Sequence, residues 1–201
     1  MQFGKGKVVA ADVIYRDSKA KPESRVIRFP DRWYTREYPP KESLPDGKPW
    51  FLYPGPPNDL TLACGPIELS HPATLKAVLA TATVKRPAGT YDKVRTTFYQ
   101  GRITLGELYK ANSAFRVPVN AKPVGEYAKI PVTWKLWLGK DQLVRRCRSS
   151  YARPIIVPGM HSDERFRHTE DIRLSSWGTK ANIQPPPTDQ VATYDDLDPP
   201  E

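Results

Sequence analysis

Residues 129–138, Lys-Ile-Pro-Val-Thr-Trp-Lys-Leu-Trp-Leu, contain the clearest strand pattern of the chain. Apolar side chains occupy every second position, which is the period of a β-strand with one buried face. Residues 139–141, Gly-Lys-Asp, then supply a turn, and residues 142–148 return as the second arm of a hairpin. The pattern predicts that Trp134 faces a hydrophobic core and that Trp137 faces away from it.

Further periodic segments indicate a strand-rich chain with short helices. The other strand candidates are residues 60–69, 94–103, 153–157 and 171–177. A helix of about three turns is expected after Ser70 as its N-cap, because apolar residues recur at positions 75, 78, 79 and 82. A second short helix is expected at residues 105–110, with Thr104 as its cap.

The two ends of the chain differ in composition from its middle. Residues 1–59 hold nine of the 22 prolines, so we expect extended chain lying against a surface, with short strands at 8–15 and 25–29. Residues 185–201 carry five carboxylates and no Lys or Arg, which predicts a flexible, acidic, proline-containing tail. Residues 60–184 are therefore expected to form the core domain.

These segments predict an α+β fold. We expect one strand-rich domain with one or two short helices and with extended proline-rich ends. A length of 201 residues suits a single domain with a modest core. The mean hydropathy of −0.58 is polar for a globular chain but does not reach the disordered range.

Charge and cysteine content restrict the class of protein. The net charge of +9 favours a nucleic acid, an anionic lipid surface or an acidic protein as the partner. Cys64 and Cys147 are too few for a disulfide framework and lack zinc spacing, so we expect reduced thiols. The N-terminus lacks the apolar core of a signal peptide, and no apolar run has the length that spans a bilayer. We expect a chain that is soluble or peripheral to a membrane.

Six cations in and after the predicted hairpin form the candidate binding site. They are Lys135, Lys140, Arg145, Arg146, Arg148 and Arg153. Such a cluster can clamp phosphates while an aromatic ring, Trp137 or Tyr151, stacks on a base or inserts at an interface. The alternative is a solvated strand edge whose charges prevent pairing with another edge.

The remaining motifs point to binding rather than to chemistry. His161 and His168 have neither the helical spacing of a metalloprotease pair nor the spacing of a zinc finger. We therefore expect a protein that is not an enzyme and uses no cofactor, metal ion or small-molecule substrate. In the tail, Tyr194 and Leu197 have the form of a short linear motif that an extended segment presents to a partner.

One segment resembles a known family. It begins with residues 65–72, Gly-Pro-Ile-Glu-Leu-Ser-His-Pro, continues through the expected helix, and ends with Arg86-Pro87 and residues 90–94, Thr-Tyr-Asp-Lys-Val. This order is similar to the strand-to-helix opening of rhabdovirus-type matrix proteins. The chain departs from that family at its N-terminus, which is not lysine-rich. It also departs at residues 37–40, Glu-Tyr-Pro-Pro, where the proline-proline-x-tyrosine budding motif is reversed.

The resemblance implies a viral matrix protein with an α+β fold. Such a protein is a non-enzymatic structural and assembly protein of the virion and the host cytoplasm, which condenses a nucleocapsid, lines an anionic membrane and associates with copies of itself. The alternative is a small coat or nucleic-acid-packaging protein with a strand-rich sandwich fold. Coat proteins of this size usually carry an arginine-rich arm, whereas the first fifteen residues here contain only Lys5 and Lys7 as cations.

Overall fold

The computed structural model describes residues 1–5, 7–15, 24–36, 43–57, 60–112, 122–154 and 165–197. The chain divides into two compact units. Unit 1 comprises Met1–Thr61 and Thr179–Glu201, and unit 2 comprises Leu62–Gly178. Unit 2 lies within the predicted core domain 60–184, and the predicted N-terminal segment 1–59 and tail 185–201 lie in unit 1. The described residues are mostly in strands and include three short α-helices, so the prediction of a strand-rich fold with few short helices is confirmed.

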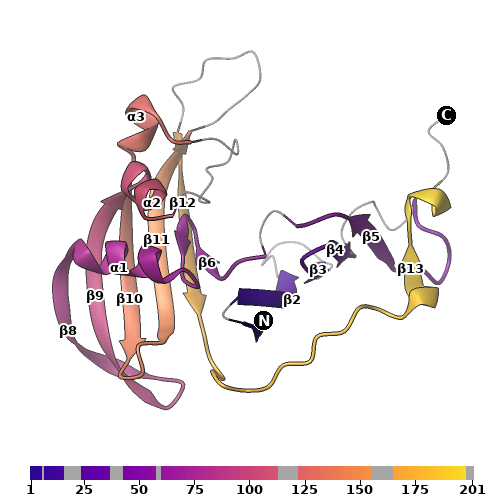
Figure 1. Cartoon of the computed structure of the whole chain (residues 1–201), viewed down its shortest axis with the longest axis horizontal. Coiled ribbons are helices and arrows are strands. Elements are labelled where there is room, and N and C mark those ends of the chain that lie inside the picture. Colours follow the sequence, from indigo (N-terminus) through magenta and orange to yellow (C-terminus); the bar gives the residue numbers. More distant parts are fainter. Residues whose placement is uncertain are drawn as a thin grey trace. The chain divides into compact units, whose positions relative to one another are not determined.

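Unit 2 is built on a five-stranded antiparallel sheet with the order β12-β11-β10-β9-β8 (Figure 1). Its strands are β8 (Ala82–Tyr91), β9 (Val94–Thr104), β10 (Pro131–Gly139), β11 (Val144–Pro154) and β12 (Arg165–Arg173). The predicted hairpin is confirmed as β10 and β11, and their register places Trp134 opposite Ser149. β10 therefore lies in the middle of the sheet, between β9 and β11.

One face of this sheet carries the core of unit 2. On it, β10 contributes the buried side chains of Val132, Trp134, Leu136 and Leu138, as the alternation predicts. Helices α1 (Pro72–Ala80) and α2 (Leu105–Ala111) pack against each other and against β9. Figure 1 shows α1 crossing the sheet at β9 and β10. The short strands β6 (Ala63–Cys64) and β7 (Ile67–Glu68) pair, and β6 contacts β11 and β12.

Side-chain caps set the starts of the two longer helices. Thr104 caps α2 and forms a reciprocal capping box with Glu107, so this predicted cap is confirmed. The N-cap of α1 is His71, whose Nδ1 accepts from the Thr74 amide, and not Ser70, whose hydroxyl donates to Glu68. The third helix, α3 (Gly125–Ala128), is a single turn that precedes β10.

The ends of several strands differ from the predicted ones. β8 starts at Ala82, one residue after α1, and continues through residues 86–89, Arg-Pro-Ala-Gly. The strand tolerates Pro87 because it lies at the sheet edge and its pairing shifts between Pro87 and Thr90. β12 lies earlier than the expected strand at 171–177. Residues 155–157 and 37–40 lie outside the described residues.

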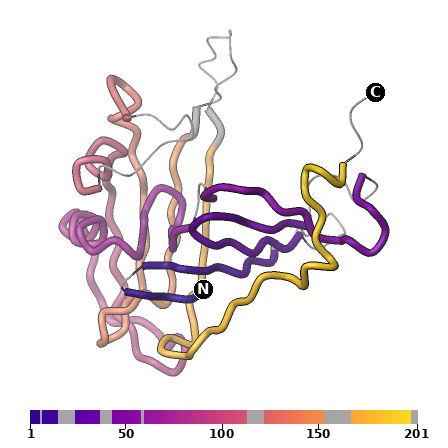
Figure 2. Tube along the Cα trace, turned by 45° about the vertical axis from the view of Figure 1, so that its right-hand side comes forward, coloured from indigo at the N-terminus to yellow at the C-terminus, as the bar shows by residue number. Residues whose placement is uncertain are grey.

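Unit 1 contains a six-stranded sheet with the order β1-β2-β3-β4-β5-β13, and Figure 2 shows its first strands running side by side. The strands are β1 (Gln2–Gly4), β2 (Lys7–Tyr15), β3 (Ser24–Arg28), β4 (Arg32–Thr35), β5 (Trp50–Pro54) and β13 (Val191–Ala192). The two expected short strands are confirmed as β2 and β3. The extended chain expected for the rest of 1–59 is not confirmed, because β4 and β5 pair within the sheet.

The C-terminal segment is part of unit 1 up to Leu197, so the predicted flexible tail is wrong for these residues. It contains the 3-10 turns η2 (Thr188–Gln190) and η3 (Tyr194–Asp196), and β13 between them pairs in parallel with β5. Ala192 is fully buried, and Lys48 Nζ lies 2.5 Å from the Asp196 carboxylate. The hydrogen bond from Lys48 holds the pKa of Asp196 below its usual value, so the ion pair stabilises docking above the ordinary pKa of Asp and is lost in acid.

We predict that Trp134→Ala destabilises unit 2 by about 3–5 kcal/mol, because it truncates a buried aromatic side chain. Trp134 is 1% exposed, and its Nε1 donates to Thr81 Oγ1. Trp137→Ala should cost much less, because Trp137 lies half-buried on the other face. Urea denaturation followed by circular dichroism measures both costs, and the reverse order would contradict the register of β10.

We predict that Ala192→Asp releases the C-terminal segment, since a buried unpaired charge costs more than about 3 kcal/mol. Limited proteolysis read by mass spectrometry should then cut residues 185–197 at least about tenfold faster than in the unchanged chain. The exposed Asp195 is the matched position, and Asp195→Ala should leave the cleavage rate unchanged. Equal rates for all three proteins would show that β13 does not dock.

Candidate functional site

The face of the unit 2 sheet opposite the core, which we call the open face, gathers cations from four strands. On β10 this face carries the side chains between the buried ones, namely Thr133, Lys135 and Trp137. The pairing register extends each of them into a row of neighbours across the sheet. The first row is Arg102, Thr133, Ser150 and Thr169. The second row is Gln100, Lys135, Arg148 and Asp171.

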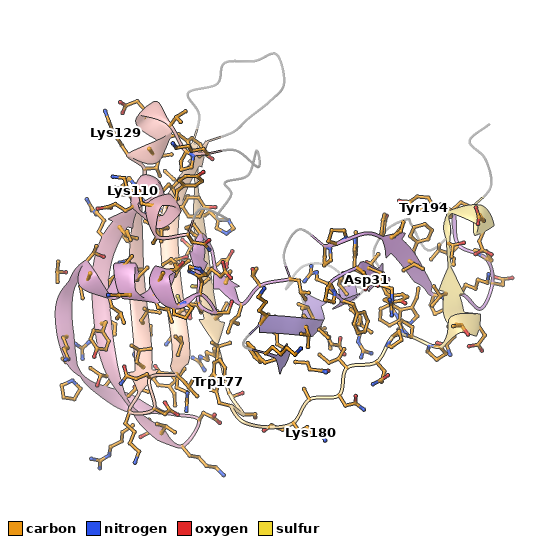
Figure 3. All side chains as sticks on the ribbon, viewed as in Figure 1. Asp31, Lys110, Lys129, Trp177, Lys180 and Tyr194 are labelled. Carbon is orange, nitrogen blue, oxygen red and sulfur yellow. The ribbon has the colours of Figure 1, made fainter. Side chains whose placement is uncertain are left out.

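All residues of these two rows except Asp171 line a groove of about 660 Å³, which we call the open-face groove. Its lining comprises Thr83, Gln100, Gly101, Arg102, Thr133, Trp134, Lys135, Arg148, Ser149, Ser150, Arg167 and Thr169. Four of these residues are cations and none is Asp or Glu. The groove lies toward the end of β10 that follows Lys129, which Figure 3 labels at the end of the sheet opposite Trp177.

The cations of the groove are available to a ligand. Arg102 and Arg148 are exposed and Lys135 is half-buried. Within the described part of the chain, none of these three forms an ion pair within 4 Å. The nearest carboxylate in their rows, Asp171, is already held by Arg146, whose Nε and Nη2 lie 2.8 and 2.6 Å from its two oxygens. That double hydrogen bond holds the pKa of Asp171 below its usual value, so its carboxylate stays charged and paired with Arg146.

A stack of aromatic rings and guanidinium groups forms the third row of the open face. Phe98 and Trp137 have ring centroids 5.0 Å apart, with Arg86 at 4.7 Å from the Phe98 ring and Arg146 at 4.8 Å from the Trp137 ring. Tyr91 also contacts Trp137, and its hydroxyl accepts from Arg146. Because Arg146 lies over Trp137, this ring is not the free stacking platform that the sequence suggests. This third row lies beside the groove.

Arg145 does not belong to the open face, which corrects its inclusion in the predicted site. Its side chain is 3% exposed, and Nη2 donates to Asp141 at 2.6 Å while Nε lies 4.0 Å from Asp92. The Arg145 carbonyl accepts from the Leu174 amide. A bulge where β11 pairs with Trp137 and Leu138 leaves Arg145 outside the ladder and turns it inward. Arg145 therefore joins two turns and the segment after β12.

The other predicted site residues lie in different places. Lys140 is exposed in the β10–β11 turn, at the opposite end of β10 from the groove. Tyr151 is buried on the core face and packs against His168, so it offers no ring to a ligand on the open face. Arg153 lies on β11, but its side chain is outside the described part. Of the five predicted cations whose side chains are described, Lys135 and Arg148 line the groove.

The predicted linear motif in the tail lies in unit 1. Tyr194 contacts Phe51 and Tyr53 edge-on, at centroid distances of 5.1 and 6.0 Å. The Leu197 amide donates to the Tyr194 carbonyl and closes the η3 turn. These residues form a turn against β5 instead of an extended segment.

Two cysteines meet in the core of unit 2. Cys64 on β6 and Cys147 on β11 are fully buried, and both are free thiols. A hydrogen bond between the two thiols, followed by burial, raises the pKa of Cys147. Cys147 is therefore protonated at neutral pH and is not an activated nucleophile. Among the described residues no cluster of His, Cys, Asp or Glu can hold a metal ion.

Sequence reasoning missed Arg102, Arg167 and the uncharged lining residues of the groove. Arg102 and Gln100 lie at alternate positions of the predicted strand 94–103, which is a signal that they share a face. Their pairing with β10, which brings them beside Lys135, depends on a contact between strands about thirty residues apart. No local pattern in the sequence predicts this pairing of β9 with β10.

No known family model matches the chain, and no curated protein is significantly similar to it in sequence. None of the helices in the described ranges is long and apolar enough to cross a membrane. The function must therefore be inferred from the open-face groove itself.

We predict that Arg145→Gln lowers the stability of unit 2 and that Arg148→Gln leaves it nearly unchanged. Arg145→Gln should destabilise unit 2 by about 1.5–3 kcal/mol, because it removes the charged hydrogen bond that the buried Arg145 guanidinium donates to the exposed Asp141. Arg148→Gln should change stability by no more than about 0.5 kcal/mol, because the side chain is exposed. Urea denaturation of both variants checks this, and a large loss for Arg148→Gln would assign that residue to the scaffold.

Proposed function

We propose that this chain is a non-enzymatic nucleic-acid-binding protein whose unit 2 holds a single-stranded sugar–phosphate backbone in the open-face groove. The observation that carries the proposal is the groove lining, which among the described residues holds four cations and no carboxylate. Lys and Arg contacts to phosphates supply most of the affinity of such binding, and arginine can bond a phosphate through two parallel donors.

The spacing of the cations favours a ligand with several anionic groups. Arg102 lies on β9 and Arg167 on β12, which are separated by three strand spacings. At about 4.8 Å between neighbouring strands this is about 14 Å. One phosphate is too small to contact the whole set, whereas successive phosphates of a strand that crosses the sheet can reach each cation in turn.

The shape of the site favours nucleic acid over a membrane. The cations line a groove on the sheet, and a single strand can enter a groove more readily than the flat surface of a bilayer can. Since Arg146 covers the Trp137 ring, base stacking in the groove is limited and binding should show little sequence preference.

We place this binding within the assembly role expected from the sequence. In a matrix or coat protein of a virus, a groove of this kind contacts the nucleocapsid or the packaged nucleic acid, and self-association of the chain repeats the contact along a strand. Location in the virion and the host cytoplasm belongs to the same proposal. Contact with an anionic membrane is the competing outcome of the experiment below.

The test replaces Arg102, Lys135 and Arg148 by Gln and measures binding of a fluorescent twelve-nucleotide oligouridylate by anisotropy over a salt series. Each lost phosphate contact should flatten the slope of log K against log salt by about 0.7, so the triple variant should lose a slope of about 2. A matched control replaces the exposed Lys76, Lys110 and Lys140 by Gln. This variant loses the same charge outside the groove.

The proposal is contradicted if the control variant loses binding while the groove variant retains it. It is also contradicted if the unchanged chain binds phosphatidylserine vesicles but not the oligonucleotide. Circular dichroism of each variant establishes that its fold is intact.

A further inference from the structure

The open-face groove contains hydroxyl and amide groups among its cations. Thr83, Thr133 and Thr169 are exposed, Gln100 and Ser150 are half-buried, and all five line the groove with Arg102, Lys135, Arg148 and Arg167. A site that bound phosphate oxygens only would need donors only, because those oxygens are acceptors. The chemistry of these five groups therefore bears on which nucleic acid is bound.

Two of the hydroxyl groups have already used their hydrogen. Thr83 Oγ1 donates to the Gln100 carbonyl at 3.3 Å, and Thr133 Oγ1 donates to the Ser150 carbonyl at 3.1 Å. A carbonyl oxygen can only accept, so the direction of both bonds is fixed. Both threonine oxygens therefore face the groove with lone pairs and no hydrogen to give.

A third pair of hydroxyl groups, Ser150 and Thr169, keeps one hydrogen. Ser150 Oγ accepts from Arg167 Nη1 at 3.5 Å and from Thr169 Oγ1 at 2.9 Å. Thr169 has therefore given its hydrogen to Ser150, whereas the Ser150 hydroxyl can still donate. Gln100 is the one uncharged group in the second row that offers both a donor and an acceptor.

Acceptors beside cations match a ligand that carries hydroxyl donors next to anionic groups. A phosphate oxygen facing Thr83 or Thr133 would meet a lone pair, whereas a hydroxyl hydrogen would complete the bond. In RNA, each ribose carries a 2′-hydroxyl adjacent to the phosphates, and DNA lacks it. We propose that the open-face groove binds RNA in preference to DNA, with ribose 2′-hydroxyls donating to Thr83 and Thr133. This inference rests on the proposed binding of nucleic acid.

The experiment compares three twelve-nucleotide ligands on the full chain by fluorescence anisotropy at one salt concentration. They are oligouridylate, the 2′-deoxy equivalent with the same uracil bases, and 2′-O-methyl oligouridylate. Oligouridylate should bind about fivefold to tenfold more tightly than the deoxy ligand, as one or two net hydrogen bonds provide. The 2′-O-methyl ligand should bind as weakly as the deoxy ligand, because it keeps the oxygen but has no hydrogen to donate.

The double variant Thr83→Val and Thr133→Val identifies the groups responsible. Valine keeps the β-branched shape that suits a strand, so the sheet should be retained, which circular dichroism checks. The variant should bind oligouridylate and the deoxy ligand equally, so the preference for RNA is lost. Thr90→Val, an exposed position of β8 outside the groove, is the matched control and should keep the preference.

The outcomes distinguish this inference from the proposed function on which it rests. If none of the three ligands binds, the proposed function itself is wrong. If all three bind equally, or if the double variant keeps the preference for RNA, nucleic-acid binding stands and the role of the threonine oxygens is wrong.

Heparin, which carries hydroxyls and sulfates without ribose, serves as the competitor. Binding of heparin tighter than that of oligouridylate would overturn the assignment to RNA.

Discussion

The alternation of side chains along β10 is the constraint on which the remaining features of unit 2 depend. β10 is the middle strand of its sheet, and it directs Trp134 and Leu136 into the core and Thr133 and Lys135 to the open face. A slip of one residue would place Lys135 in the core and Trp134 in solvent, so burial fixes the register strongly. The same register aligns cations and hydroxyl groups from four strands in the groove. The binding face is therefore a geometric consequence of the core.

The alternation is interrupted at the bulge in β11, and the displaced residue, Arg145, has a different role from its neighbours. The bulge in β11 turns Arg145 toward Asp141 and Asp92, while its neighbour Arg146 stays on the open face and pairs with Asp171. Two adjacent arginines thereby take separate roles, one in joining turns and one in pairing with Asp171, which lies opposite Arg148. Arg148, two positions further on, keeps an unpaired charge among the described residues.

The sequence predicts local features well and distant ones poorly. The β10–β11 hairpin, β9 and the Thr104 cap all follow from residues that are close in the chain, and the structure confirms them. The groove joins β9 and β12 to that hairpin, and pairing over such separations leaves no local pattern. The C-terminal segment shows the same limit. Its polar, proline-rich composition predicts flexibility, yet Ala192 is buried beside β5, because a short strand needs few apolar atoms when a sheet edge is available.

Lysine footprinting tests most directly whether the open face is the binding surface. The full chain is acetylated with a limited amount of reagent, with and without oligouridylate, and the modified lysines are measured by mass spectrometry. Lys135 in the groove should be protected by the RNA, while Lys110 and Lys140, which are exposed on unit 2 outside the groove, should react as before. Protection of Lys110 or Lys140 with Lys135 unchanged would place the nucleic acid elsewhere and contradict the assignment of the open face.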